Sequence, residues 1–264
     1  MCRICFLIAS ILLSWTVSKS VSADDPISLR VLCYNIHHGE GTDGKVDLER
    51  LAGLIKAAKP DLVALQEVDN KTGRTGGVDQ TAELARLTGL TGRFAYQIDY
   101  DGGRYGQAIL SRHPISDVTI HLLPGMPDRE QRIAGSAEVE IQGRKLVFAT
   151  THLHHANESI RVLQAEKLNE YFVHSESFRD RSMVITGDFN AVPNSEPIRI
   201  LEQYWTSATK GNSDFLTFPA VKPERQLDYL FFRPADQFSV TSANVIDESV
   251  VSDHRPVLIE LKMK

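Results

Sequence analysis

The sequence has few cysteines and no strong excess of charge of either sign. Three cysteines occur among 264 residues, and 29 Lys+Arg stand against 34 Asp+Glu, which gives a formal net charge of −5. So few cysteines exclude a disulfide-stabilised scaffold, and a hydrophobic content of 42% excludes a disordered or collagen-like chain. The mild acidity gives no sign of a protein that binds nucleic acid or an anionic membrane.

The N-terminal apolar run is too short to cross a membrane. It covers residues 4–17 after Arg3, whereas a transmembrane helix needs about 20 apolar residues. A polar stretch follows, and then the small residues of 21–23, which are spaced as a signal peptidase requires. We therefore expect residues 1–23 to be a cleaved secretory signal peptide, with an uncleaved anchor as the alternative. The protein would then be secreted or periplasmic, without stable membrane insertion after cleavage.

Cleavage after Ala23 would also change the charge and the cysteine content. It would remove two basic residues and no acidic one, which moves the formal net charge from −5 to −7. Cys2 and Cys5 would be lost, and Cys33 would have no internal partner for a disulfide. Because Cys33 lies in the apolar run 31–34, we expect a buried and unreactive thiol.

The rest of the chain, residues 24–264, contains no internal repeat and no linker, which indicates one domain. Short apolar runs rich in Val, Ile and Phe predict strands at 28–36, 61–66, 93–98, 107–111, 118–122, 137–141, 145–151, 183–186, 226–232 and 256–261. Helical periodicity predicts helices at 48–58, with Asp47 as N-cap, at 80–87 and at 157–174. Many strands with few, separated helices indicate an α/β protein with more than one sheet and helices on the outside.

Polar side chains stand at the ends of several of these strand-like runs. They are Asn35, Glu67, Asp188, Asp228 and the pair Asp253–His254. A carboxylate or amide held against an apolar sheet is costly unless it is paired or binds a metal. Alone, each of these residues is more typical of a turn or a surface. Their joint occurrence predicts one shared polar site.

The residue types suggest a chemistry for that site. Glu67 is an oxygen donor of the hard type that Mg²⁺ or Mn²⁺ prefers. Asp188 and Asn190 are two residues apart, so on an extended backbone they point to the same side. Asp228 and His254 could form a pair in which the carboxylate fixes the ring in one tautomer, as proton transfer requires.

Seven segments together resemble the endonuclease/exonuclease/phosphatase superfamily of metal-dependent phosphoesterases. They are YNIHHG (34–39), LQEV (65–68), YGQAILSRHPI (105–115), THLHH (151–155), TGDFNAVP (186–193), LDYLFF (227–232) and SDHRPV (252–257). They occur in the family's order and span nearly the whole of residues 24–264. The resemblance implies a four-layer α/β sandwich, with two central mixed β-sheets faced by helices and the site at one edge.

The resemblance also implies roles for individual residues. Glu67 is expected to be the main Mg²⁺ ligand (Mn²⁺ is the alternative), with Asn35 beside it and Asp253 near the metal. His254, oriented by Asp228, would hold or protonate the phosphoryl group. Asp188 would position or deprotonate the attacking water, and Asn190 would hydrogen-bond a phosphate oxygen. His152 is similar to the second catalytic histidine of the deoxyribonuclease, sphingomyelinase and inositol-phosphatase branches. The sequence leaves open which group is the general base.

One position departs from the deoxyribonuclease pattern. Where those enzymes have an acidic partner for the second histidine, this chain has Gln107, which can orient a histidine but stabilises its cation less. Gln107 is also a candidate substrate-binding residue, together with Arg74 and Arg132. Arg74 and Arg132 lie in segments that resemble loops near the family's site, and arginine is suited to binding phosphate, although a solvated surface role is an equal alternative. Four further histidines flank the motifs: His37, His38, His154 and His155. Neighbouring histidines at strand ends are more often exposed, which is what we expect of them, with a place for His38 at the mouth of the site as the alternative.

Three functions remain open at this point. The first is an exported phosphomonoesterase or phosphodiesterase that acts on a small or lipid-derived phosphate ester. The second is an extracellular nuclease, which we favour less because the chain has no Lys/Arg-rich tract. The third is a non-catalytic binding module, which would keep its function in Glu67→Ala. We expect a monomer whose partner is its phosphate-ester substrate.

Overall fold

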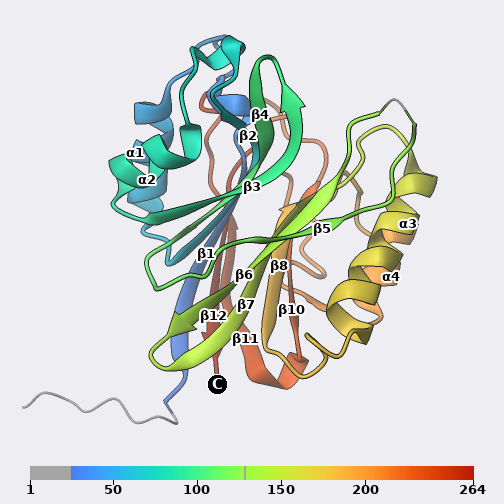
Figure 1. Ribbon diagram of the computed structural model, residues 1–264. Helices are drawn as coiled ribbons and strands as arrows, with labels where there is room; N and C mark the ends of the chain where they lie inside the picture. The colour runs from blue at the N-terminus through green and yellow to red at the C-terminus, as the bar shows by residue number, and fades with distance from the viewer. Residues whose placement is uncertain (1–24, 128) are drawn as a thin grey trace, which may run out of the picture.

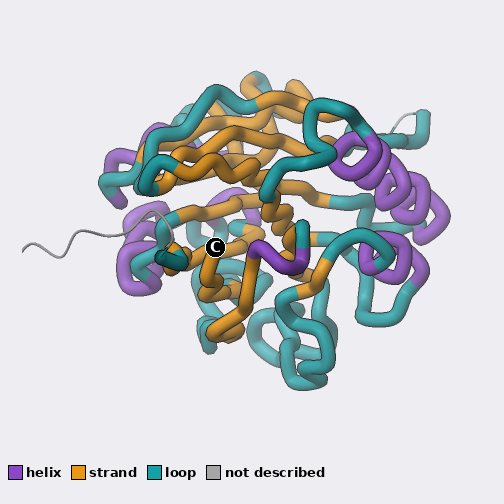
Figure 2. Tube along the Cα trace, turned by 90° about the horizontal axis from the view of Figure 1, so that it is seen from below, coloured by secondary structure: helices purple, strands orange, loops and turns teal. Residues whose placement is uncertain are grey.

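The computed structural model describes residues 25–127 and 129–264, so the expected signal peptide lies outside the described residues. Two six-stranded sheets pack face to face, and helices cover their outer faces (Figure 1). Viewed from below, the strands form two central layers with helices on the outside (Figure 2). This is the α/β sandwich that the sequence predicts. In the described part of the chain, none of the helices combines the length and apolar character that a membrane crossing needs.

Each sheet contains one parallel pair of strands among antiparallel ones. The first sheet has the order β11-β12-β1-β2-β4-β3, and β1 runs parallel to β2. Its strands are β1 (Ile27–Asn35), β2 (Leu62–Asn70), β3 (Thr91–Tyr100), β4 (Gly103–Ser111), β11 (Phe238–Val245) and β12 (Val257–Met263). The second sheet has the order β5-β6-β7-β8-β10-β9, and β7 runs parallel to β8. Its strands are β5 (Thr119–Leu122), β6 (Ile133–Ile141), β7 (Arg144–His152), β8 (Met183–Asp188), β9 (Thr206–Ser207) and β10 (Asp228–Arg233).

The helices form two pairs, one for each sheet. Helices α1 (Leu48–Ala58) and α2 (Gln80–Thr88) cover the first sheet, and α3 (Glu158–Asn169) and α4 (Glu196–Glu202) cover the second (Figure 1). The carboxylate of Asp47 accepts a hydrogen bond from the backbone of Arg50 and caps α1 as the sequence predicts. Helix α3 continues into a π-helical turn, Glu170–His174. Short 3₁₀ turns occur at His37–Gly39, Gly73–Thr75 and Ala235–Gln237.

The strand period of two residues decides which side chains enter the space between the sheets. In β1, Val31 and Cys33 belong to the core between the sheets, so Asn35 follows on that same face. The same alternation leads from Val184 to Asp188 in β8. It also leads from Phe148 to His152 in β7 and from Leu230 back to Asp228 in β10. The apolar core therefore ends in a set of inward-facing polar side chains at one edge of the sandwich. Cys33 is fully buried, as expected.

Below this edge, a chain of buried polar side chains joins the two sheets. Gln66 of β2 donates a hydrogen bond to the hydroxyl of Thr150 in β7 over 3.0 Å. That hydroxyl donates in turn to the side-chain oxygen of Gln107 in β4 over 2.9 Å. Because all three residues are fully buried, these bonds fix how the sheets sit against each other directly beneath the polar edge.

Candidate active site

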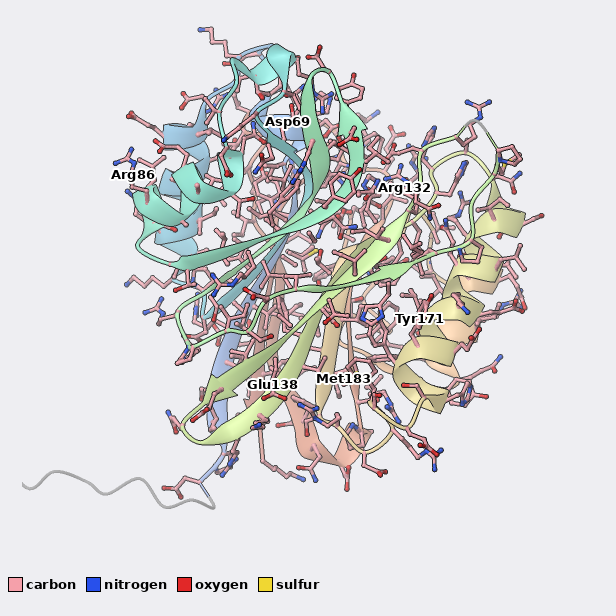
Figure 3. The ribbon with its side chains drawn as sticks, in the orientation of Figure 1. Asp69, Arg86, Arg132, Glu138, Tyr171 and Met183 are labelled. Atoms are coloured by element: carbon pink, nitrogen blue, oxygen red, sulfur yellow. The ribbon has the colours of Figure 1, made fainter. Side chains whose placement is uncertain are left out.

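The polar side chains meet where β1, β2, β7 and β8 end and β10 begins, at the upper end of the sandwich in Figure 1. Figure 3 shows Asp69 and Arg132 toward this end, whereas Glu138 and Met183 lie toward the opposite end. The strand register brings the key residues together directly: Asp188 is paired with His152 on one side and with Asp228 on the other. Asn35, from the facing sheet, completes the group.

One carboxylate oxygen of Asp188 is the centre of the site. Its Oδ2 atom accepts a hydrogen bond from Nδ2 of Asn35 at 3.2 Å, and it lies 3.5 Å from Nε2 of His152 and 3.6 Å from Nε2 of His254. The other oxygen, Oδ1, accepts a hydrogen bond from the backbone N–H of Asn190 at 2.8 Å. The carboxylate is therefore held on one side by the turn that follows β8, while the other side faces two imidazoles and an amide.

His254 is held by a second carboxylate. Its Nδ1 atom lies 2.9 Å from Oδ2 of Asp228, which turns Nε2 toward Asp188. The ring of Phe218 packs against the imidazole with a centroid separation of 4.7 Å. Asp228 and Phe218 thus fix the orientation of the His254 ring, and the pairing with Asp228 is the one that the sequence suggested.

Burial and neighbouring charge raise the pKa values of Asp188 and His254 and lower that of His152. Burial raises the pKa of Asp188, and Asp228 adds to this shift. Burial alone would lower the pKa of His254, but the negative charges of Asp228 and Asp188 outweigh it and raise that pKa well above its usual range. Burial, together with the cations Arg132 and His254, holds the pKa of His152 well below its usual range. At neutral pH the site therefore combines a cationic His254 with a neutral His152.

Glu67 reaches this group through an irregularity in β2. The pairing of β2 with β4 shifts register between Leu65 and Val68, and Glu67 has a positive φ of 58°. A regular strand would place Glu67 on the face opposite Gln66. In the structure, Oε1 of Glu67 instead accepts a hydrogen bond from Nδ2 of Asn35 at 2.9 Å. One amide group therefore bridges Glu67 and Asp188.

Asn190 and Asp253 lie at the rim of this group. Asn190 has a positive φ of 49°, and its side-chain amide donates one hydrogen bond to the backbone oxygen of Leu153. An amide NH₂ has a second donor, which is the one available to a ligand. The carboxylate of Asp253 accepts a hydrogen bond from the hydroxyl of Ser252.

Arg132 is buried with unused hydrogen-bonding capacity. Only 3% of the residue is exposed, and Nη1 lies 3.1 Å from the carboxylate of Glu130. Among the described residues, neither Nε nor Nη1 has a partner in hydrogen-bond geometry. Burial raises the pKa of Glu130, which also accepts a hydrogen bond from Gln97. A buried guanidinium that is ion-paired with Glu130 but has N–H groups outside hydrogen-bond geometry retains capacity to bind a further anion.

Arg74 lies in the wall of a cavity of about 310 Å³, which it shares with Ile98, Tyr100, Tyr105 and Glu130. The guanidinium makes two hydrogen bonds of 2.8 Å to the carboxylate of Asp69 and lies 4.6 Å above the Tyr100 ring. The negative charges of Glu67 and Glu130 act on Tyr105 and add to the raised pKa that its burial produces. The basic and acidic side chains of the cavity wall are paired, Arg74 with Asp69 and Glu130 with Arg132.

Gln107 does not have the role expected for it. The residue is fully buried (0% exposed), and its amide donates to Gln97 and to the backbone oxygen of Ile133 while its oxygen accepts from Thr150. Since both ends of the side chain are used between the sheets, Gln107 is not placed to contact a substrate. None of its described hydrogen bonds goes to His152.

The expectation that the flanking histidines are exposed is wrong for two of them. His155 is exposed and His37 is half-buried, but His38 and His154 are buried. His38 is turned inward because it and His37 adopt positive φ values of 44° and 45° in the turn that follows β1. The sequence shows the His–His pair but not this backbone conformation. Glu130 and Tyr105 were also not singled out as site residues.

Two groups of described side chains could hold a metal ion. In each group, three ligand atoms lie within 4.8 Å of one another: His37, His38 and Glu67 in one, and Asp188, Asp228 and His254 in the other. Oδ1 of Asp228 is buried without a hydrogen-bond partner among the described residues, so it has capacity for a further ligand. Carboxylate and neutral imidazole donors are the usual ligands of divalent cations, so the group of His37, His38 and Glu67 fits such an ion. In the other group, a cationic His254 has no lone pair for a metal, which leaves the two carboxylates as its possible ligands.

A two-sheet sandwich with carboxylates, amides and imidazoles at one edge has the donor groups that hydrolysis of a phosphoester requires. The chain belongs to the Endonuclease/Exonuclease/phosphatase family, because the sequence model of that family matches residues 32–254. Members of this family are hydrolases that act on phosphoesters, and they generally depend on divalent metals. The family assignment made from the sequence is therefore confirmed.

Solved structures with the same fold include three that illustrate its range. An endonuclease/exonuclease/phosphatase family protein of Bacteroides thetaiotaomicron is 20% identical, with a TM-score of 0.76 over 91% of this chain and 96% of that chain. A mannosyl-6-phosphatase of the same species is 19% identical, with a TM-score of 0.72 over 88% and 99%. The catalytic domain of human Nocturnin is 22% identical, with a TM-score of 0.68 over 91% and 97%. A comparison with curated protein sequences gave no match.

Proposed function

We propose that the protein is an exported, Mg²⁺-dependent phosphoesterase that hydrolyses a small phosphomonoester or phosphodiester by in-line attack of water. The observation that carries the proposal is the convergence of Asn35, His152 and His254 on a single oxygen of Asp188. Such an arrangement offers an acceptor for a proton of water and donors for phosphoryl oxygens within one small volume.

The residues divide the work of the reaction between them. Asp188 accepts a proton from the attacking water, whose oxygen forms a bond to phosphorus while the bond to the leaving oxygen breaks. The leaving oxygen keeps the bonding electrons and takes up a proton, so one water is consumed. Cationic His254 donates a hydrogen bond to a phosphoryl oxygen and stabilises the charge that develops there. Asn190 donates a second such bond.

Glu67 would hold the Mg²⁺ ion, with Asn35 and Asp253 beside it. The ion supplies charge neutralisation to the phosphoryl group. Asn35 also positions the two carboxylates that it bridges, because its amide donates to both Glu67 and Asp188. Mn²⁺ is the alternative ion with similar preference for oxygen ligands.

Arg132 supports a substrate with an accessible phosphate group. Its buried guanidinium raises the local positive potential, which is felt by His152 and His155. Arginine N–H groups match phosphate oxygens in geometry and charge. We therefore assign Arg132 to a non-bridging oxygen of the bound ester.

The cavity lined by Arg74, Tyr105 and Glu130 supports a small leaving group. At about 310 Å³, it has the size of a small-molecule site. Its tyrosines and paired charges suit a polar, uncharged group such as a sugar or polyol better than a polyanion. The activity of the mannosyl-6-phosphatase with the same fold is consistent with such a leaving group.

The test compares an aryl phosphomonoester, an aryl phosphodiester, a hexose phosphate and plasmid DNA as substrates of the purified protein. We expect turnover of a small ester that requires Mg²⁺ and is abolished by EDTA and by Glu67→Gln. DNA nicking without turnover of the small esters would instead identify a nuclease. No turnover of any of the four substrates with Mg²⁺ or Mn²⁺ would contradict the proposal.

A further inference from the structure

We infer that His37 and His38 add nitrogen ligands to the cation held by Glu67, so that this position binds a borderline transition ion such as Co²⁺ or Zn²⁺ more tightly than Mg²⁺. The inference rests on the cation site of the proposed function but not on the identity of the substrate. A ring nitrogen of each histidine and a carboxylate oxygen of Glu67 lie within 4.8 Å of one another.

The hydrogen bonds of the two rings leave one nitrogen of each free for a metal. Nδ1 of His37 lies 3.3 Å from the backbone oxygen of Glu40, and Nε2 of His38 lies 3.3 Å from the carboxylate of the same residue. Both acceptors are oxygens, so in each pair the ring N–H donates. Nε2 of His37 and Nδ1 of His38 are then the nitrogens with lone pairs. Metal-bound histidines typically use their second nitrogen in this way.

His38 provides an independent indication that a ligand is missing. The residue is 8% exposed, and its Nδ1 atom is buried without a hydrogen-bond partner among the described residues. A buried nitrogen with an unused lone pair is costly unless something binds it. This is the same nitrogen that the contact with Glu40 leaves free.

The backbone is strained where these ligands are attached. His37, His38 and Glu67 have φ values of 45°, 44° and 58°, in the left-handed region that is unfavourable for residues with a Cβ atom. Gln80 holds the turn by donating a 2.7 Å hydrogen bond to the backbone oxygen of His38. Strain of this kind persists where the surrounding structure maintains it and clusters at functional sites.

Two imidazoles and one carboxylate form a donor set with a defined metal preference. Oxygen-only sites suit Mg²⁺, whereas imidazole favours transition ions such as Fe²⁺, Co²⁺, Ni²⁺ and Zn²⁺. With His37 and His38 in place, the site should therefore discriminate between the two classes of ion. Without the two histidines, the remaining oxygen ligands should lose this discrimination against Mg²⁺.

The test is a calorimetric titration of the purified, chelator-treated protein with CoCl₂ and separately with MgCl₂, together with the visible absorption spectrum of bound Co²⁺. We expect the wild-type protein to bind Co²⁺ at least tenfold more tightly than Mg²⁺. His37→Gln and His38→Gln should each raise the dissociation constant for Co²⁺ about tenfold or more and change the Co²⁺ spectrum. They should change the constant for Mg²⁺ less than about threefold. Glu67→Gln should weaken the binding of both ions.

Two further variants separate ligand loss from a disturbed fold. Glu40→Gln keeps both rings but removes the carboxylate that orients His38, and we expect a loss of roughly tenfold in Co²⁺ affinity, as for other residues that support a metal ligand. His174→Gln is the matched control, because His174 is exposed on the π-helical turn after α3. It should bind both ions as the wild type does.

Three results would overturn the inference. The first is equal affinity of the wild type for Co²⁺ and Mg²⁺, and the second is an unchanged Co²⁺ affinity and spectrum in both histidine variants. The third is an equal loss of affinity for Co²⁺ and for Mg²⁺ in those variants. Ester hydrolysis is measured on the same samples with Mg²⁺. Turnover without the expected Co²⁺ binding would leave the proposed function standing and contradict only the histidine ligands. Co²⁺ binding as expected without turnover of any ester would support the histidine ligands and contradict the proposed function.

Discussion

His254 contacts a different carboxylate with each of its ring nitrogens. Nδ1 faces Asp228 at 2.9 Å and Nε2 faces Asp188 at 3.6 Å. The two negative charges keep the imidazole protonated in spite of its burial. Because Asp228 contacts the His254 imidazole directly, we expect its effect on the reaction to pass through that ring.

We expect Asp228→Asn to move the alkaline limit of activity to lower pH. A reaction that requires cationic His254 proceeds below the pKa of that residue and is lost as the pH rises through it. Removing the Asp228 charge lowers this pKa, so the loss should begin about one pH unit or more earlier. The measurement is the pH profile of kcat/KM, with Asp214→Asn at an exposed position as the control. An unchanged alkaline limit would show that His254 does not act as a cation.

Arg132→Gln should weaken the binding of substrate and of inorganic phosphate. A hydrogen bond to a charged group contributes roughly 1.5–3 kcal/mol, so we expect KM and the inhibition constant of phosphate to rise about 10- to 100-fold. Steady-state kinetics with phosphate as inhibitor provide the measurement. Arg86→Gln, at an exposed ion pair with Glu83 on α2, is the matched control. Equal phosphate inhibition of both variants would exclude Arg132 from phosphate binding.

At the level of single residues, the sequence predicted the central group better than its surroundings. Asp188, Asp228 and His254 could be selected because each follows or precedes an apolar run. The burial of Arg132 and the inward turn of His38 could not, because both depend on tertiary packing and on backbone angles that no sequence pattern shows. The same reason explains why Gln107, which matched a family position, proved to be a residue of the core.

At the level of the elements, strand β2 shows how a sheet can present a catalytic side chain. Up to Leu65 it follows a regular alternation, and the shift of register before Val68 then turns Glu67 toward Asn35. The apolar run predicted the strand but not the shift. Strand β11 was missed because half of its side chains are polar and half are exposed at the sheet edge, so that it has no continuous apolar run. The ten predicted strands and three predicted helices each contain enough apolar periodicity to be recognised.

We expect Thr150→Val to lower the free energy of unfolding by about 1–3 kcal/mol, the cost of leaving buried polar groups unpaired. The substitution keeps the shape of the side chain but removes the hydroxyl that links Gln66 to Gln107 across the two sheets. Chemical denaturation measures the change. Thr119→Val, at an exposed position of β5, should change stability much less. Equal stability of the two variants would mean that the buried chain of hydrogen bonds does not hold the sheets together.

At the level of the whole molecule, the four layers explain why the site can be assembled from distant segments. Helices α1 and α2 bury one face of the first sheet, and α3 and α4 bury one face of the second, so both inner faces remain for the shared core. The strand ends then place Asn35 and Asp188 against each other although 153 positions separate them in the chain. The family resemblance predicted this architecture, whereas composition alone indicated only an α/β protein.

Export is a prediction about the whole chain. Expression in a secreting host should yield a protein that begins at Asp24, because cleavage is expected after Ala23. Mass spectrometry of the exported protein gives its N-terminus. Recovery only from the cell interior, with residues 1–23 retained, would contradict the prediction.

The most direct test of the account is the activity of Asp188→Asn toward a small phosphate ester. The substitution preserves the shape of the side chain but removes the proton acceptor on which Asn35, His152 and His254 converge. General-base catalysis contributes about 10²- to 10⁴-fold, and we expect kcat to fall by that factor while Asp236→Asn, at an exposed position, retains full activity. A kcat within about threefold of the wild type would contradict the assignment of this site as the reaction centre.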